Sequence, residues 1–260
     1  MKRTVARRRW VALGALACLA IGAFACGATL GDEAAAPQPS VAETLSPQLL
    51  AGERIVVGLR GTTISPGLRQ AIARGRVAGV VLFAENLPSR AAGRRLIARL
   101  QGIERPPKLR DPLLVMTDQE GGLVKRIGGA PTASAQEMGE SGAAFSARQG
   151  RRTAANLRDL GVNVDLAPVL DVGRPGGVIA VTERSFGSTA ARVEGTAIPF
   201  AKALQAGGVV ATGKHFPGFG AATESTDFSV ERIGLSKREL RAVDERPYTA
   251  FAEAGGGVVS

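Results

Sequence analysis

The sequence has few aromatic residues, one histidine and two cysteines, and each shortage excludes a class of site. Aromatic residues make up 4% of the 260 residues, and no basic cluster has aromatics beside it, so we expect no nucleic-acid-binding surface. His215 is the only histidine, which excludes a zinc site of the His-Glu-x-x-His kind. Cys18 and Cys26 lie in or beside the N-terminal apolar run, so the rest of the chain has no disulfide and no thiolate nucleophile. We expect neither a metal nor a cofactor.

The N-terminus carries much of the excess positive charge and is typical of an export signal. The chain has 33 basic and 23 acidic residues, but five of the basic residues stand in the first nine positions. An apolar stretch from Val11 to about Phe24 follows, and Ala23-Phe24-Ala25 fits a small-x-small cleavage site. Residues 1–30 are therefore predicted to be a signal peptide or a membrane anchor, because Val11 to Leu30 is just long enough to span a bilayer.

Cys26 follows the predicted cleavage site directly, which is also the position of the lipidated cysteine in bacterial lipoproteins. Contact with a membrane would then be made through this cysteine or through an uncleaved anchor. Residues 31–50, rich in Ala, Pro, Ser and acidic residues, are predicted to be a flexible linker. Residues 51–260 are expected to form one domain, extracytoplasmic and monomeric.

From Ile55 onward, short β-branched apolar runs alternate with longer amphipathic stretches, which is the pattern of βα units around a parallel sheet. The predicted strands are Ile55–Leu59, Gly79–Phe83, Leu113–Thr117, Val162–Leu166 with Val169–Val172, Val209–Thr212 and Gly257–Val259. The predicted helices are Pro66–Arg74, Ser89–Gln101, Ala143–Leu160, Ala190–Ala206 and Lys237–Ala254. Ser236 and Glu239 form a capping box at the start of the last helix, and Ser89 is a second N-cap.

Polar residues follow successive strands, and their positions favour a barrel over a doubly wound sheet. No Gly-x-Gly-x-x-Gly follows the first strand, whereas Glu85, Asp118, Asp171 and Lys214 each stand just after a predicted strand. In a (β/α)8 TIM-type barrel these ends converge on one face, where active sites lie. The predicted fold is therefore an α/β barrel of this type, truncated after about six strands.

Four strings at these strand ends resemble the N-terminal domain of glycoside hydrolase family 3, in particular its bacterial β-N-acetylglucosaminidases. The resemblance covers most of the chain from about Ile55 to Ser260. The strings, which occur in the family's order, are Asp118-Gln119-Glu120-Gly121-Gly122 with Arg126, Val164 to Val172, Glu183-Arg184-Ser185-Phe186-Gly187 and Lys214-His215-Phe216-Pro217-Gly218.

The resemblance implies that five residues hold a sugar in the subsite next to the cleaved bond: Asp118, Arg126, Arg184, Lys214 and His215. Their chemistry suits this role, because a sugar offers neutral hydroxyls that need donors and acceptors at fixed angles. The alternative roles are helix capping for Asp118, a solvated charge for each arginine, and a buried structural pair for Lys214.

The chain departs from the family in the loop after Lys214, where the glucosaminidases carry a histidine as general acid/base. Counting from Lys214, Asp227 occupies that position and Ser225 the position of the aspartate before it. Asp227 or Glu224 is therefore the candidate proton donor, since glycosidases commonly use a carboxylic acid with a raised pKa. The alternative is that both are exposed loop acids without a role in catalysis.

The family's nucleophile is an aspartate on a later strand, so we expect it beyond Ser260, with these 260 residues as a fragment of a longer protein. The predicted function is an exported glycosidase that cleaves β-linked amino sugars, such as peptidoglycan-derived N-acetylglucosaminides, by a retaining mechanism. Two alternatives stay open: a non-catalytic sugar-binding member, and a β-glucosidase or β-xylosidase of the same family. In each case the expected partner is a carbohydrate.

Overall fold

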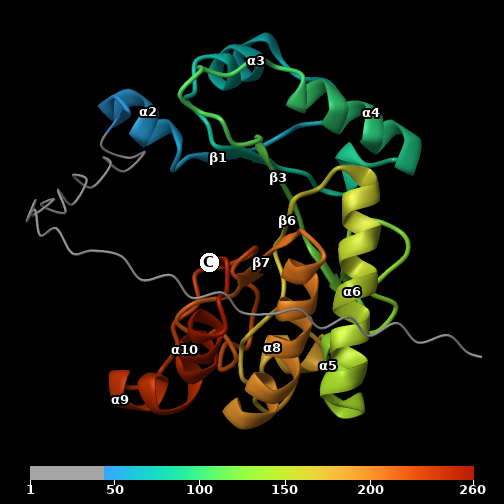
Figure 1. Cartoon of the computed structure of the whole chain (residues 1–260). Helices are drawn as coiled ribbons and strands as arrows, with labels where there is room; N and C mark the ends of the chain where they lie inside the picture. The colour runs from blue at the N-terminus through green and yellow to red at the C-terminus, as the bar shows by residue number, and fades with distance from the viewer. Residues whose placement is uncertain (1–43) are drawn as a thin grey trace, which may run out of the picture. The chain divides into compact units, whose positions relative to one another are not determined.

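Six parallel strands lie at the centre of the structure, a computed structural model that describes residues 44–260 (Figure 1). The predicted signal or anchor, Cys26 and most of the predicted linker lie outside the described residues. The strands are β1 (Val56–Gly58), β2 (Gly79–Val81), β3 (Leu114–Thr117), β6 (Val164–Asp165), β7 (Val210–Gly213) and β8 (Val258–Val259). Each pairs in parallel with the next along the chain. A doubly wound sheet would reverse this order at a switch point, so the barrel-type fold is confirmed.

Nine α-helices accompany these strands among the described residues. They are α2 (Pro47–Gly52), α3 (Pro66–Ala73), α4 (Arg90–Gln101), α5 (Ala135–Ser141), α6 (Ala143–Leu160), α7 (Val178–Val181), α8 (Ala190–Ala206), α9 (Lys237–Glu239) and α10 (Arg246–Glu253). The predicted N-caps are confirmed: Ser89 accepts a hydrogen bond from Ala92 N, and Ser236 and Glu239 form the reciprocal capping box. Within residues 44–260 no helix combines the length and the hydropathy that a bilayer span requires.

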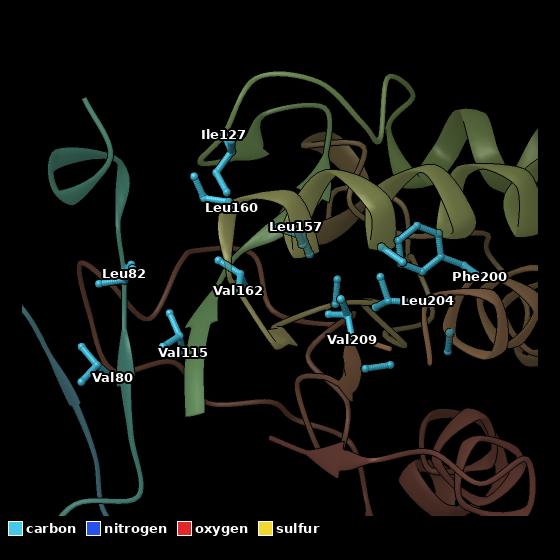
Figure 2. Packing of buried hydrophobic residues seen from close by; sticks show 14 of the residues in the cluster. Val80, Leu82, Val115, Ile127, Leu157, Leu160, Val162, Phe200, Leu204 and Val209 are labelled. Carbon is cyan, nitrogen blue, oxygen red and sulfur yellow. The ribbon is translucent and has the colours of Figure 1, made fainter. Parts of the chain in front are cut away.

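The helices cover the sheet through a continuous apolar core. Val80 of β2 pairs with Val115 of β3, and both are fully buried, as is Leu82 directly after β2. Figure 2 shows these side chains together with Leu157 and Leu160 of α6 in the same cluster. At about 25 cal/mol per Å² of buried apolar surface, this core supplies most of the favourable free energy that fixes the strand ends in space.

Three details differ from the sequence-based expectations. The predicted helix Lys237–Ala254 is wrong as one element, because a π-helical turn at Leu240–Asp244 separates α9 from α10. Pro247 stands in the first turn of α10 and has no N–H to continue a helical ladder from the preceding turn. The predicted strand Val169–Val172 is reduced to an isolated bridge between Val169 and Lys214. The segment Pro47–Gly52 is helical, although the composition predicts a flexible linker up to residue 50.

Candidate active site

The predicted sugar-binding residues come from three separate strand ends. Asp118 follows β3, Lys214 and His215 follow β7, and Arg184 follows α7 in the long connection after β6. Because β3, β6 and β7 are adjacent and parallel, their carboxyl ends open on the same edge of the sheet. The fold therefore brings side chains together that lie almost 100 positions apart in the sequence.

A small antiparallel hairpin places Arg126 over Asp118. The hairpin pairs β4 (Gln119–Gly121) with β5 (Val124–Lys125), and its turn uses Gly121 and Gly122, both with positive φ. The buried Gln119 amide holds it closed: Nε2 donates to Ile127 O at 2.8 Å, and Oε1 accepts from Arg126 N at 3.1 Å. As a result the Arg126 guanidinium lies 3.3 Å from the second oxygen of Asp118.

Lys214 is the centre of the charged cluster. Its Nζ lies 2.8 Å from Asp118 Oδ1 and 2.7 Å from Glu120 Oε1, and its side chain is 7% exposed. Burial would lower the pKa of Lys214, but the carboxylates of Glu120 and Asp118 outweigh it and raise the pKa above its ordinary value. Burial likewise opposes ionisation of Asp118, yet Lys214 and Arg126 keep the pKa of that carboxyl below its ordinary value. Both shifts favour the charged forms of Lys214 and Asp118 at neutral pH.

Arg184 and His215 continue the cluster on the other side of Glu120. The Arg184 guanidinium grips Glu120 as a fork, with Nε at 2.9 Å from one oxygen and Nη2 at 2.8 Å from the other. Glu120 and neighbouring carboxylates raise the pKa of Arg184 although burial opposes this. Nη2 also lies 3.3 Å from Nε2 of His215, whose Nδ1 is 2.7 Å from Asp171 Oδ2. All five predicted residues thus belong to one connected network.

The structure adds three residues to which the sequence assigned no role in the site. Glu120 bridges Lys214 and Arg184, Asp171 holds His215, and the Tyr248 hydroxyl lies 3.3 Å from Asp171 Oδ1. Glu120 and Asp171 stand at strand ends inside the recognised strings, so position alone could have identified them. Tyr248 lies within α10, and nothing in the local sequence indicates that it reaches the site.

Asp165 is a buried carboxyl that lies beneath this network. Its side chain is fully buried at the end of β6, Oδ1 accepts from Gln119 N at 3.0 Å, and Oδ2 has no hydrogen-bond partner among the described residues. Burial raises the pKa of Asp165 well above its ordinary range, and the nearby charges of Glu120 and Asp118 add to this. The group is therefore favoured in its neutral form.

The two candidate proton donors lie apart from the network. Glu224 and Asp227 are exposed on the loop after β7, and the Asp227 backbone N–H donates to Ser225 Oγ at 3.2 Å. Among the described residues, no hydrogen bond or ion pair joins either carboxylate to the five predicted binding residues. The same loop exposes Phe228 and Val230 almost completely.

The chemistry of the network suits sugar binding better than nucleophilic attack on a sugar. Each carboxylate in it is paired with at least one cation or with His215, which makes it a poor free nucleophile and a well-fixed acceptor. The arginines and Lys214 supply donors, so the edge presents both kinds of polar partner that sugar hydroxyls need. Among residues 44–260, no group of three or more His, Cys, Asp and Glu side chains is arranged to hold a metal ion.

Comparison with known protein families shows which family has this sequence pattern. The model of the glycosyl hydrolase family 3 N-terminal domain matches residues 48–260, which is most of the chain and includes every residue of the network. The chain belongs to glycosyl hydrolase family 3. The similarity to this family inferred from the four strand-end strings is thereby confirmed.

Individual relatives agree with the family assignment. An uncharacterized secreted glycosyl hydrolase of Arthroderma benhamiae is 36% identical over 229 residues, covering 85% of this chain and 64% of that protein. A beta-hexosaminidase of Xanthomonas euvesicatoria is 34% identical over 214 residues, covering 79% of this chain and 62% of that protein. This family 3 chain therefore spans slightly less than two thirds of these relatives' length.

A solved structure shows the same fold. The family 3 beta-N-acetylglucosaminidase from a Paenibacillus species superposes with a TM-score of 0.72 at 32% identity, covering 82% of this chain and 41% of that one. The barrel-type architecture of this family member is thus supported by sequence and by fold, and the chain is similar to a bacterial β-N-acetylglucosaminidase in both.

Proposed function

We propose that this chain is the sugar-recognition part of an exported glycoside hydrolase that acts on β-linked N-acetylated amino sugars. The observation that carries the proposal is the network around Lys214, which fixes Asp118, Glu120 and Arg184 as paired, buried or half-buried donors and acceptors at the carboxyl ends of adjacent strands. The beta-hexosaminidase relative and the glucosaminidase structure support an amino sugar over a glucoside or xyloside. Cell-wall glycan fragments are the proposed source of this sugar.

We further propose a retaining mechanism with Asp227, or Glu224 in its place, as the proton donor. A retaining glycosidase uses two carboxyl groups about 5–5.5 Å apart: one protonates the leaving oxygen while the other attacks the anomeric carbon. Each carboxylate of the network is paired with a cation or with His215, so none of them is proposed as the nucleophile. That group is predicted for the part of the relatives' length that this chain does not span.

Export and membrane attachment remain part of the proposal. They rest on the order of basic residues, apolar stretch and Ala23-Phe24-Ala25 in the sequence, and on the position of Cys26. The secreted relative from Arthroderma supports export and does not bear on lipidation.

Titration calorimetry with N-acetylglucosamine, and with glucose as the comparison sugar, tests the proposed specificity. We expect binding of the acetylated sugar at least tenfold tighter than that of glucose. Equal affinities would leave a family 3 sugar site without the proposed preference, and absence of binding to both would overturn the proposal.

A specific observation favours one second candidate, a sugar-binding protein without hydrolytic activity. Neither loop acid contacts the network, and the family's histidine acid/base is absent from the chain. Turnover of an aryl N-acetylglucosaminide by the wild-type protein separates the two, because hydrolysis excludes the second candidate, and the kinetics of Asp227→Asn then test the donor. With Asp227 as donor, poor leaving groups should be cleaved about 10²–10⁴-fold more slowly while activated aryl glycosides are affected much less. Glu231→Gln in the same loop is the matched control.

A further inference from the structure

Asp171 makes more hydrogen bonds than any other carboxylate near the site, and it is fully buried. Oδ2 lies 2.7 Å from Nδ1 of His215. Oδ1 accepts from three donors: His215 N at 3.2 Å, Phe219 N at 2.7 Å and the Tyr248 hydroxyl at 3.3 Å. One carboxylate thus fixes the backbone on both sides of the Phe-Pro-Gly turn and also the imidazole ring.

The neighbours of the ring determine which of its nitrogens carries the proton. A carboxylate can only accept, so Nδ1 facing Asp171 must carry a hydrogen. A guanidinium can only donate, so Nε2, which faces Arg184 Nη2 at 3.3 Å, must offer a lone pair. The two contacts require the same neutral tautomer independently of each other.

We propose that Asp171 is a positioning residue that holds His215 as the Nδ1–H tautomer, so that Nε2 presents a hydrogen-bond acceptor to the sugar site. The ring and its charge state are then part of substrate recognition, a consequence that rests on the proposed function. His215 cannot at the same time donate a proton from Nε2. It therefore does not replace the acid/base histidine that this chain lacks.

Tyr248 ties this device to α10. The residue is 4% exposed, its ring packs edge-on against Phe216 with centroids 5.3 Å apart, and its hydroxyl completes the set of donors to Asp171. Burial and the charge of Asp171 raise the pKa of the Tyr248 hydroxyl, which favours its protonated, hydrogen-donating form. A movement of α10 would therefore shift Tyr248 and Asp171, and with them the His215 imidazole.

Imidazole ¹⁵N spectroscopy of the full chain tests the proposal, because His215 is the only histidine and gives the only imidazole signals. At pH 8, above the ordinary histidine pKa of about 6.5, wild type should show a protonated Nδ1 and an unprotonated Nε2. A protonated Nε2 in wild type would overturn the proposal without any variant.

Asp171→Asn should reverse the tautomer, because the contact of residue 171 with Nδ1 at 2.7 Å is closer than the Arg184 contact with Nε2 at 3.3 Å and outweighs it. The two backbone donors at Oδ1 need an oxygen there, so the amide nitrogen is expected at the Oδ2 position, where it donates to Nδ1 and moves the ring proton to Nε2. Asp165→Asn removes a different fully buried carboxyl group that does not contact His215, and it should leave the spectrum unchanged. A folded Asp171→Asn protein that keeps Nδ1–H would contradict the positioning role.

Sugar affinity provides the separate functional readout. Asp171→Asn should weaken N-acetylglucosamine binding about 10- to 100-fold, whereas Asp165→Asn should not. If wild type shows the expected tautomer but binds no sugar, the proposed function fails and the positioning of His215 stands. If wild type binds sugar and the Asp171 variant binds equally well, the positioning role fails and the proposed function stands.

Discussion

Lys214 shows how a single buried charge organises the site. Among residues 44–260 it is the one lysine that contacts two carboxylates, Asp118 and Glu120, with less than a tenth of its side chain exposed. Without it each carboxylate would keep a single cationic partner, Arg126 at 3.3 Å from Asp118 and Arg184 at 2.8 Å from Glu120, and would lose its contact with the buried ammonium group. The network is therefore a single unit for stability as well as for binding.

Replacing this lysine should destabilise the fold. We expect Lys214→Met to lower the free energy of unfolding by about 3–5 kcal/mol, the usual cost of removing one partner from a buried ion pair. Urea denaturation measures this, with Lys202→Met on the exposed side of α8 as the control, expected to change stability by less than about 0.5 kcal/mol. Equal effects at the two positions would show that the Lys214 pairs do not stabilise the protein.

Asp165 should make stability depend on pH in the opposite sense to an ordinary salt-bridged aspartate. Its folded-state pKa is raised by burial above the unfolded value of about 3.9. The stability that it contributes is complete below that pH and is lost as the pH rises through the folded-state pKa.

Asp165→Asn removes this titration while keeping the acceptor for Gln119 N. The stability of the variant relative to wild type should therefore increase as the pH is raised from about 4 to 7, measured by urea denaturation at each pH. A difference that stays constant over this range would show that Asp165 ionises in the folded protein as it does in the unfolded chain.

The sequence predicts some residues of the site network and misses others. The five binding residues stand in strings at strand ends, so their convergence followed once the parallel sheet was inferred. Glu120 was visible in the same string, but its bridging position depends on the β4–β5 hairpin. Tyr248 contacts Asp171 across 77 positions, and such a contact depends on how α10 packs rather than on any local pattern.

Helices α6 and α8 have the closest packing that the structure shows between two long elements. They run side by side (Figure 1), and a Cβ added to Gly150 of α6 would stand 2.4 Å from the Phe200 carbonyl oxygen of α8. Ser146 Oγ also donates to Thr196 O across this interface at 2.7 Å. The glycine is required by the approach of the two backbones.

Two alanine substitutions test this packing. Gly150→Ala should destabilise the protein by about 1–3 kcal/mol, because a methyl group there overpacks the interface. Gly195→Ala in α8 has no heavy atom near its new Cβ and should stabilise by about 0.5–1 kcal/mol through helix propensity. Thermal unfolding of both variants gives the comparison, and a stabilising Gly150→Ala would contradict the close approach.

Among the secondary-structure elements, the sequence predicts the bounds of the long helices best. The bounds of Ala143–Leu160 and Ala190–Ala206 were predicted to the residue, because amphipathic periodicity over many turns leaves little ambiguity. Short elements such as α5, α7 and the β4–β5 hairpin were missed, since tertiary contacts rather than local periodicity define them. The sequence predicts one continuous last helix, whereas the missing N–H of Pro247 goes with a break in the regular helix at Leu240–Asp244.

For the whole molecule, the order of the strands was the informative feature. Six parallel strands in chain order give a barrel-type sheet whose site lies at the carboxyl ends, as the strand-end residues predicted. What the sequence could not supply was the relation of the Glu224–Asp227 loop to the site, because an exposed loop has no periodicity and few contacts to define it.

Export is a prediction for the whole molecule. Fractionation of the producing cells should recover the protein outside the cytoplasmic membrane, with a mature N-terminus near Cys26 or with an intact anchor. Recovery of the chain from the cytoplasm with Met1 or its neighbour as the N-terminus would contradict the assignment of residues 1–30.

The central claim is that five residues from three strand ends form one sugar subsite. Titration calorimetry of N-acetylglucosamine against alanine variants of Asp118, Arg126, Arg184, Lys214 and His215 tests it most directly. Each variant that retains the wild-type fold by circular dichroism should lose about 1–3 kcal/mol of binding free energy, the cost of leaving buried polar partners unmet. The exposed Arg232→Ala variant should bind like wild type. Unchanged affinity in two or more of the five folded variants would contradict the account.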